Sequence, residues 1–135
     1  MEFNSLREKI AFEKQQRQDR YRQFEQVTLQ AHEAGLQAVQ GTQCPAMVVL
    51  DPTTGQKWHV PDGPCGFAYV VLRKSNTSFA IWAKKKGLFS KGYSGTQLWV
   101  SDFNQSVTLK GAYAQAYARV LNENGIECYS SSRLD

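Results

Sequence analysis

The sequence predicts an α+β protein in which a long N-terminal helix precedes one compact domain. Residues 1–41 contain no proline and are dominated by strong helix formers. The rest of the chain alternates short apolar segments with turn-forming clusters, and helix-like stretches separate the later apolar segments. We therefore expect a helical arm at 1–41 and a domain at 42–135, built on a mixed sheet of about five strands with two crossover helices.

The first helix begins with the spacing of a capping box, because Ser5 precedes Glu8 by three positions. Its apolar stripe is incomplete, and the charged residues that interrupt it are Glu13, Arg17 and Arg20. A helix that is polar through its middle cannot bury that part in a core. Two uses remain open: the helix docks on the domain by its ends, or it is an arm that pairs with another copy in a homodimer.

Turn clusters divide the first half of the domain into three strands. Segments 46–50 and 56–60 flank the sequence Asp-Pro-Thr-Thr-Gly and should form an antiparallel hairpin. A second turn leads to 66–73, the strongest strand candidate because it is rich in valine and aromatic residues. The short connections favour a meander of these three strands.

Helices separate the strands in the second half of the domain. Residues 75–78 offer several N-caps for a helix, and 96–102 alternates like a strand. A longer helix would begin at Asn104 or Ser106 and precede a last strand at 126–130. Because helical connections favour parallel neighbours, we expect the last three strands to pair in parallel.

The positive charge of the chain is confined to the domain. The net charge is +4, and residues 1–41 hold six cations and six acids, so 42–135 carries all of the excess. Residues 63–101 contain six cations, seven aromatic residues and no carboxylate. A basic segment interleaved with flat rings suits a polyanion with stackable bases.

Strand alternation predicts which rings share a face of the sheet. In 96–102, leucine and valine occupy the face expected to be core, which leaves Trp99 on the polar face. The same alternation puts Tyr129 on the polar side of the last strand, and Phe67 and Tyr69 together in 66–73. These four rings would form an aromatic platform that stacks bases, as in single-strand RNA modules. The alternative is that the first helix covers them as a second core layer.

The cations expected to grip phosphates beside this platform are Lys84, Lys85, Lys86, Lys91 and Arg73. The lysine triplet has a second interpretation, since cations in the last turn of a helix complement its dipole. Residues 87–95 read as a flexible basic loop, without the order of a P-loop. Asn104 and Ser106 either cap a helix or help its free amide groups to capture an anion.

The three cysteines are widely spaced and include no C-x-x-C pair, so we expect no zinc site and no cofactor. Cys65 and His59 flank one turn, where an imidazole could lower the pKa of the thiol and make a nucleophile; a small buried cysteine is the commoner outcome. An odd, sparse set of cysteines fits a reducing cytosol. Without a signal peptide or a long apolar segment, the sequence predicts a cytoplasmic protein that does not enter a membrane.

Three strings in the second half of the chain are distinctive: Cys-Gly-Phe-Ala-Tyr-Val at 65–70, the stretch 93–106 with its Trp-Val-Ser-Asp-Phe-Asn-Gln-Ser ending, and residues 125–135. These strings resemble a family of small tailed-bacteriophage and prophage proteins. The resemblance implies a setting, the cytoplasm of an infected bacterium, and no particular activity. Small accessory phage proteins often bind and block host machinery, including defence systems.

The sequence thus favours a non-enzymatic binding protein of phage type that engages nucleic acid or a nucleotide-like anion. A second hypothesis is a module that binds and inhibits a host protein through the first helix or the aromatic face. The third is a Cys–His hydrolase or transferase.

Overall fold

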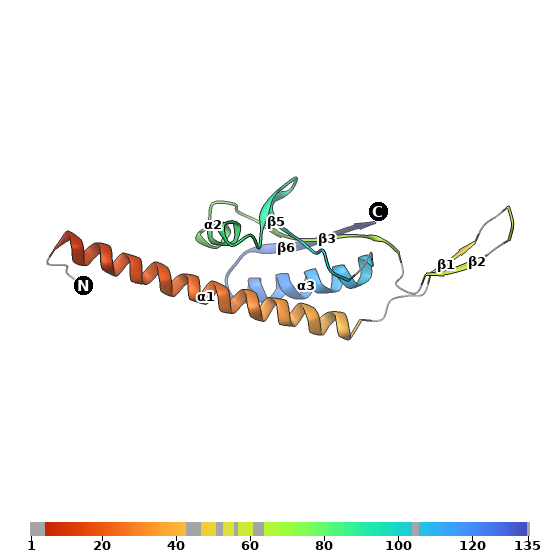
Figure 1. Cartoon of the computed structure of the whole chain (residues 1–135), viewed down its shortest axis with the longest axis horizontal. Coiled ribbons are helices and arrows are strands. Elements are labelled where there is room, and N and C mark those ends of the chain that lie inside the picture. Colours follow the sequence, from red (N-terminus) through yellow and green to blue (C-terminus); the bar gives the residue numbers. More distant parts are fainter. Residues whose placement is uncertain are drawn as a thin grey trace.

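The protein has three layers: an antiparallel sheet, helix α3 against one face of the sheet, and helix α1 against the far side of α3 (Figure 1). The structure, a computed structural model, describes residues 5–42, 47–50, 53–55, 57–60, 64–103 and 106–134, with the segments 47–50 and 57–60 described by their backbone alone. Its elements are α1 (Leu6–Gln40), β1 (Met47–Leu50), β2 (Lys57–Val60), β3 (Gly66–Leu72), α2 (Ser78–Lys85), β4 (Ser90–Gly92), β5 (Gly95–Trp99), α3 (Val107–Glu123) and β6 (Cys128–Leu134).

Every pair of neighbouring strands in the main sheet is antiparallel, in the order β4-β5-β3-β6. The central strand β3 places Tyr69 opposite Trp99 of β5 and opposite Ser131 of β6. The expected mixed sheet of about five strands, with parallel pairing, is therefore wrong. The α+β class, the long first helix and the two later helices are confirmed.

Strand β4 explains the difference in direction. It lies within 87–95, which the sequence suggested to be a flexible loop, and a turn at Tyr93 and Ser94 sends β5 back along it. β5 consequently runs against β3 instead of along it. β5 and β6, which α3 connects, do run in the same direction, but β3 lies between them. A helical connection fixes direction here without making the two strands neighbours.

The predicted hairpin is confirmed, because β1 and β2 pair antiparallel from Met47↔Val60 to Leu50↔Lys57. The three-strand meander is wrong. β3 has β5 and β6 as its neighbours, and β1 and β2 form a separate two-stranded sheet.

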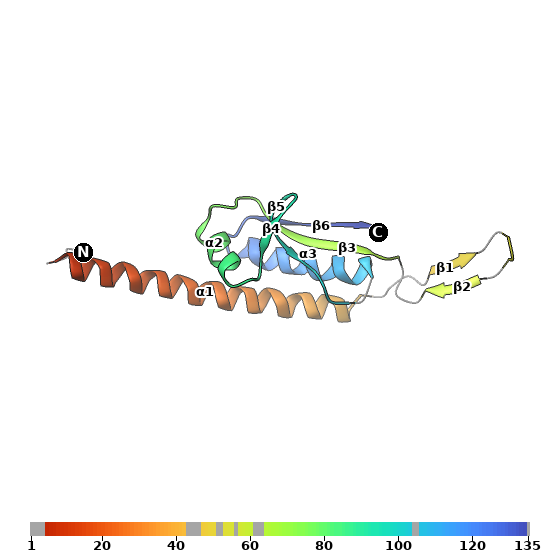
Figure 2. The same ribbon diagram turned by 45° about the horizontal axis from the view of Figure 1, so that its top comes forward.

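Helix α1 docks by its C-terminal half alone. Ala31 and Gly35 are buried against α3, and Gly35 lets the two helices approach so closely that an added Cβ would lie 2.4 Å from a ring carbon of Tyr113. The hydroxyl of Tyr113 also meets Nδ1 of His32 at 2.5 Å. The N-terminal half extends past the end of the domain (Figure 2), and nearly all of its side chains are exposed. The helix thus docks by one end and projects by the other.

Short polar side chains fix where the helices begin. Ser5, Thr77 and Ser106 each accept a hydrogen bond from the backbone amide three residues later, which satisfies one free donor of a first turn. Thr77 thus starts α2 and Ser106 starts α3. Gly87 follows α2 with a φ of 75°, a left-handed conformation that few other residues adopt.

The hydrophobic core lies between the sheet and α3, with α2 and the docked half of α1 closing one end. The strands contribute Ala68, Val70 and Leu72 from one face of β3, and Cys128 from β6. Among the described residues, no helix is long and apolar enough to cross a membrane.

Candidate nucleic-acid interface

Three aromatic side chains form a contiguous cluster on the face of the sheet opposite α3, which we call the ring cluster: Phe67, Tyr69 and Trp99. The ring of Trp99 lies 5.1 Å from that of Phe67 and 5.0 Å from that of Tyr69, measured between centroids, and the second pair meets edge to face. Trp99 is 46 % exposed, and the other two are half-buried. Such contacts hold the rings in fixed positions while leaving the indole accessible.

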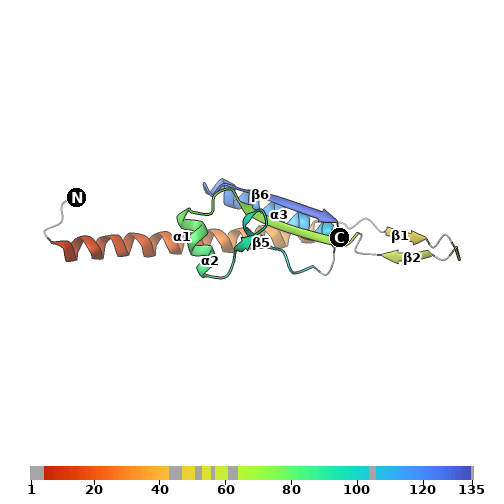
Figure 3. The same ribbon diagram turned by 90° about the horizontal axis from the view of Figure 1, so that it is seen from above.

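No helix in the described part of the chain lies over the face that carries the ring cluster. Seen from that side, the strands lie in front of α3 and α1 (Figure 3). Because α1 packs against α3, the expectation that the first helix covers these rings as a second core layer is wrong. In modules that bind single-stranded RNA, the aromatic rings that stack on bases lie on the open face of a β-sheet.

Two guanidinium groups flank the aromatic side chains of this face. Arg73 lies over the ring of Tyr129 at 5.2 Å, and Arg133 lies over the ring of Phe67 at 5.4 Å. Tyr129 itself is 36 % exposed. Among the residues that the structure describes, neither arginine forms an ion pair with a carboxylate. Cations held over rings are well placed to meet a phosphate beside a stacked base.

Arg133 was missed in the sequence because the last strand was expected to end at 130. β6 instead runs from Cys128 to Leu134. Extending the alternation of Tyr129 by two steps of two residues would have placed Arg133 on the same face. The signal was present, but serines at 130–132 resemble the end of a strand.

The lysines proposed as phosphate contacts lie elsewhere. Lys84 donates to the carbonyl of Ser75 at 3.3 Å, and Lys86 pairs with Glu25 of α1 at 3.6 Å. Lys84 and Lys85 occupy the last turn of α2, as the helix-dipole interpretation expected, and Lys91 lies on the exposed edge strand β4. The structure places Arg73 over Tyr129 on the open face and leaves the lysine triplet at the end of α2.

A buried cation lies beneath the ring cluster. Lys110 of α3 is 4 % exposed, and its Nζ donates to the carbonyl of Gly66 at 3.3 Å and lies 5.8 Å from the centre of the Phe67 ring. The helical spacing of Lys110 and Ala114 puts this lysine on the buried side of α3. Sequence reasoning missed it, since a lysine is seldom found inside.

The structure describes the remaining candidate residues only in part. Cys65 is exposed, and its backbone forms an isolated antiparallel β-bridge with Ser106. His59 pairs through its backbone with Val48. The side chain of His59 and all of Asn104 lie outside the described residues. Ser106 is buried and its hydroxyl accepts from the amide of Leu109, so it acts as the helix cap.

Part of the aromatic signal in 63–101 belongs to the core. Phe79, Trp82 and Phe89 are each 2–3 % exposed, and Tyr93 is a fully exposed ring in the β4–β5 turn. The rings of the core and of the open face are thus interleaved in sequence and separated in space.

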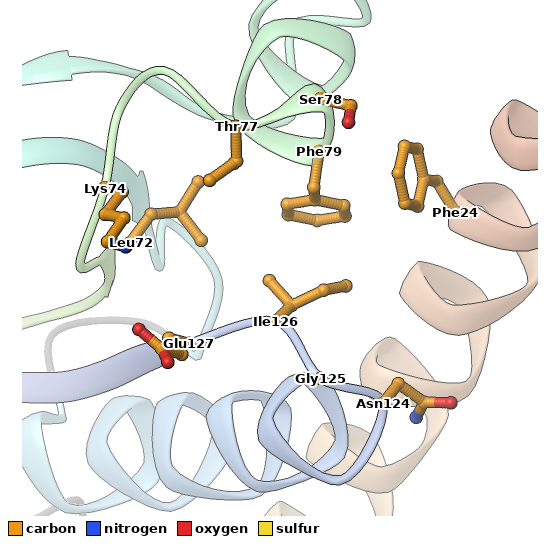
Figure 4. Close-up of a pocket in the computed structure, with 10 residues that line it drawn as sticks. All are labelled: Phe24, Leu72, Lys74, Thr77, Ser78, Phe79, Asn124, Gly125, Ile126 and Glu127. Atoms are coloured by element: carbon orange, nitrogen blue, oxygen red, sulfur yellow. The ribbon is translucent and has the colours of Figure 1, made fainter. Parts of the chain in front are cut away.

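A cavity of about 310 Å³ opens at the end of the sheet, between α1, α2 and the start of β6. Figure 4 shows Phe24, Phe79 and Ile126 converging on it, with Lys74 and Glu127 on one side. It does not include the ring cluster. Within the part of the chain that the structure describes, no three histidine, cysteine or acidic residues gather as metal ligands.

A comparison with known proteins adds no relative. No family model, no curated protein and no solved structure matches the chain.

Proposed function

We propose that the protein binds single-stranded nucleic acid on the open face of its sheet. The observation that carries this proposal is the ring cluster on a sheet face that no described helix covers, with Arg133 over Phe67 and Arg73 over Tyr129 on the same face. Stacking on exposed rings contributes about 1–3 kcal/mol per base, whatever the base, and arginines supply the contacts to the phosphates. The absence of any acidic residue from 63–101 also supports it.

The test is a titration of short single-stranded oligonucleotides with the full chain, in which binding is measured by fluorescence anisotropy. Trp99→Ala should raise Kd by about tenfold or more, because it removes the most exposed stacking surface of the cluster. Tyr93→Ala is the matched control, since it removes a fully exposed ring in the β4–β5 turn and should leave Kd unchanged. Equal affinity of Trp99→Ala and the wild type would exclude the ring cluster as the binding site.

Salt dependence distinguishes the arginines from the lysine triplet. Losing one phosphate contact makes the negative slope of log binding constant against log salt concentration shallower by about 0.7 for a single strand. We expect that reduction for Arg73→Ala and for Arg133→Ala, and no change for the triple alanine variant of Lys84, Lys85 and Lys86. The reverse result would move the interface from the open face to α2.

A second candidate function is the binding of a host protein, as the resemblance to phage proteins suggested. The projecting half of α1 supports it, because Leu6 and Ile10 are 74 % and 55 % exposed there. Pull-down from a bacterial lysate treated with nuclease separates the two functions: a protein partner that survives the nuclease supports the second, and loss of all partners supports nucleic acid.

A further inference from the structure

No described strand pairs with one edge of β6. It is the last strand in the order β4-β5-β3-β6, and it pairs with β3 along seven residues. The amide of Arg73 donates to the carbonyl of Glu127 at 3.1 Å. That bond fixes the ladder: the odd-numbered residues of β6 turn their main-chain groups toward β3, and the even-numbered residues turn theirs toward the free edge.

The first of these edge positions is closed by a side chain. The amide of Cys128 donates to Oδ1 of Asn122 at 3.0 Å, and its carbonyl accepts from Nδ2 of the same residue at 3.1 Å. Three positions then remain with edge-facing groups: Ser130, Ser132 and Leu134. Within the described residues, no hydrogen bond to these edge-facing groups occurs. Long unpaired edges are templates for another strand.

From this edge we infer that β6 pairs antiparallel with β6 of a second copy, about a two-fold axis at Ser131. In that register, Ser130 of each copy exchanges two main-chain hydrogen bonds with Ser132 of the other. These bonds use the edge-facing groups that the Asn122 side chain leaves open. The contact is isologous, as a two-fold dimer requires.

The side chains on both faces agree with this register. On the open face, Arg133 of one copy comes opposite Tyr129 of the other, which repeats between copies the pairing of guanidinium and ring seen within one copy. On the α3 face, Leu134 of one copy comes opposite Cys128 of the other. Leu134 is 67 % exposed, and a groove between α3 and β6 lies at that point, lined by Ala118, Asn122 and Cys128 among others.

Helix α3 leaves room for the second copy. It contacts both β3 and β6, so it lies beneath this pair of strands. With strands about 4.8 Å apart, the two α3 helices would be roughly 10 Å apart, the distance at which helices pack directly. The residues of α3 that line the groove beside Ser130–Ser132 are small or flexible: Gly111, Ala114 and Gln115.

The experiment measures the mass of the full chain by light scattering, from low micromolar to hundred-micromolar concentration. We expect twice the 15.2 kDa of one chain at the upper end. Ser132→Pro should raise the Kd of the dimer about 25-fold, because it removes one edge-facing donor from each copy and each of the two hydrogen bonds contributes about fivefold. Proline is tolerated on strand edges, and circular dichroism checks the fold.

Leu134→Asp should also dissociate the dimer, and Leu6→Asp is its control, since it makes the same change at an exposed leucine of α1. A wild type that stays monomeric throughout would overturn the inference. Dissociation by Leu6→Asp but not by Leu134→Asp would do so as well, in favour of pairing through α1.

The register has its own test. In a variant whose Cys44 and Cys65 are replaced by serine, Ser131→Cys should form a covalent dimer on mild oxidation, because two residues on the axis lie within disulfide reach. Lys85→Cys in the same background is the control and should remain uncrosslinked. A dimer that fails to crosslink through Ser131→Cys would exclude an axis at that residue.

Discussion

Single glycines control how closely the helices approach their neighbours. Gly35 of α1 faces Tyr113 of α3, where a Cβ would lie 2.4 Å from the ring, whereas a Cβ on Gly111 of α3 would meet nothing within 4 Å. Both glycines lie inside helices. Alanine is the better helix former by about 1 kcal/mol, so any difference between the two sites reflects packing.

We therefore expect opposite effects from the same substitution. Gly35→Ala should lower the free energy of unfolding by about 1–3 kcal/mol, as overpacking does, because α1 must shift away from Tyr113. Gly111→Ala should raise it by up to about 1 kcal/mol. Urea unfolding of the two variants beside the wild type measures both. Similar changes at the two sites would show that α1 is not held against α3 as described.

Helix α1 has two halves with different environments, and hydrogen exchange should distinguish them. The side chains of residues 6–20 are exposed except that of Phe12, whereas the half that carries Ala31 packs on α3. Local unfolding is easiest where few apolar contacts must break. We expect backbone amides of 8–18 to exchange at least about 100-fold faster than those of 28–38. Uniform protection along α1 would indicate that the projecting half is covered in solution.

The elements of this fold could be predicted largely from local chemistry. The caps at Ser5 and Ser106, the hairpin of β1 and β2, and the helices α2 and α3 all follow from short-range signals, and they were found. The pairing of strands could not be derived in the same way. A three-residue strand, β4, reverses the chain, and nothing in its sequence of Ser, Lys and Gly indicates a strand.

The candidate interface was predictable in part for the same reason. Alternation along the strands predicted the sheet face on which Trp99 and Tyr129 lie, because the face of a side chain depends only on its own strand. Which cations join them depends on which strand lies beside which, and β6 brings Arg133 to Phe67 from 66 positions away in the sequence. The lysine triplet looked closer only because it is closer along the chain.

For the molecule as a whole, alkaline pH should weaken the fold. Burial, together with the carboxylate of Asp102, raises the pKa of Tyr113 from 10.0 to about 12. Burial also raises the pKa of the Cys128 thiol from 9.0 to about 11, although Arg73 opposes the shift. Both groups are neutral when protonated, so the folded state holds their protons longer than the unfolded chain does.

The sign follows from that difference. Well below pH 9 both groups are protonated in either state and their contribution to stability is complete. As pH rises through 9 and toward about 12, the unfolded chain loses protons first, and stability falls. Urea unfolding between pH 8 and pH 11 should show the decline, and Cys128→Ala should make it shallower. A free energy of unfolding that stays level across this range would contradict the burial of these two groups.

The order of the layers also bears on how the chain is made. Helix α1 is synthesised before its docking surface, α3, which begins 67 residues after the last residue of α1. During that interval the helix leaves the ribosome with nothing to cover it, and exposed apolar surface on a nascent chain promotes aggregation. A helix that must wait in this way is safer with few apolar residues than with a full stripe. Helix α1 is rich in glutamine and arginine and has only a sparse apolar stripe, so it meets that requirement for solubility during synthesis.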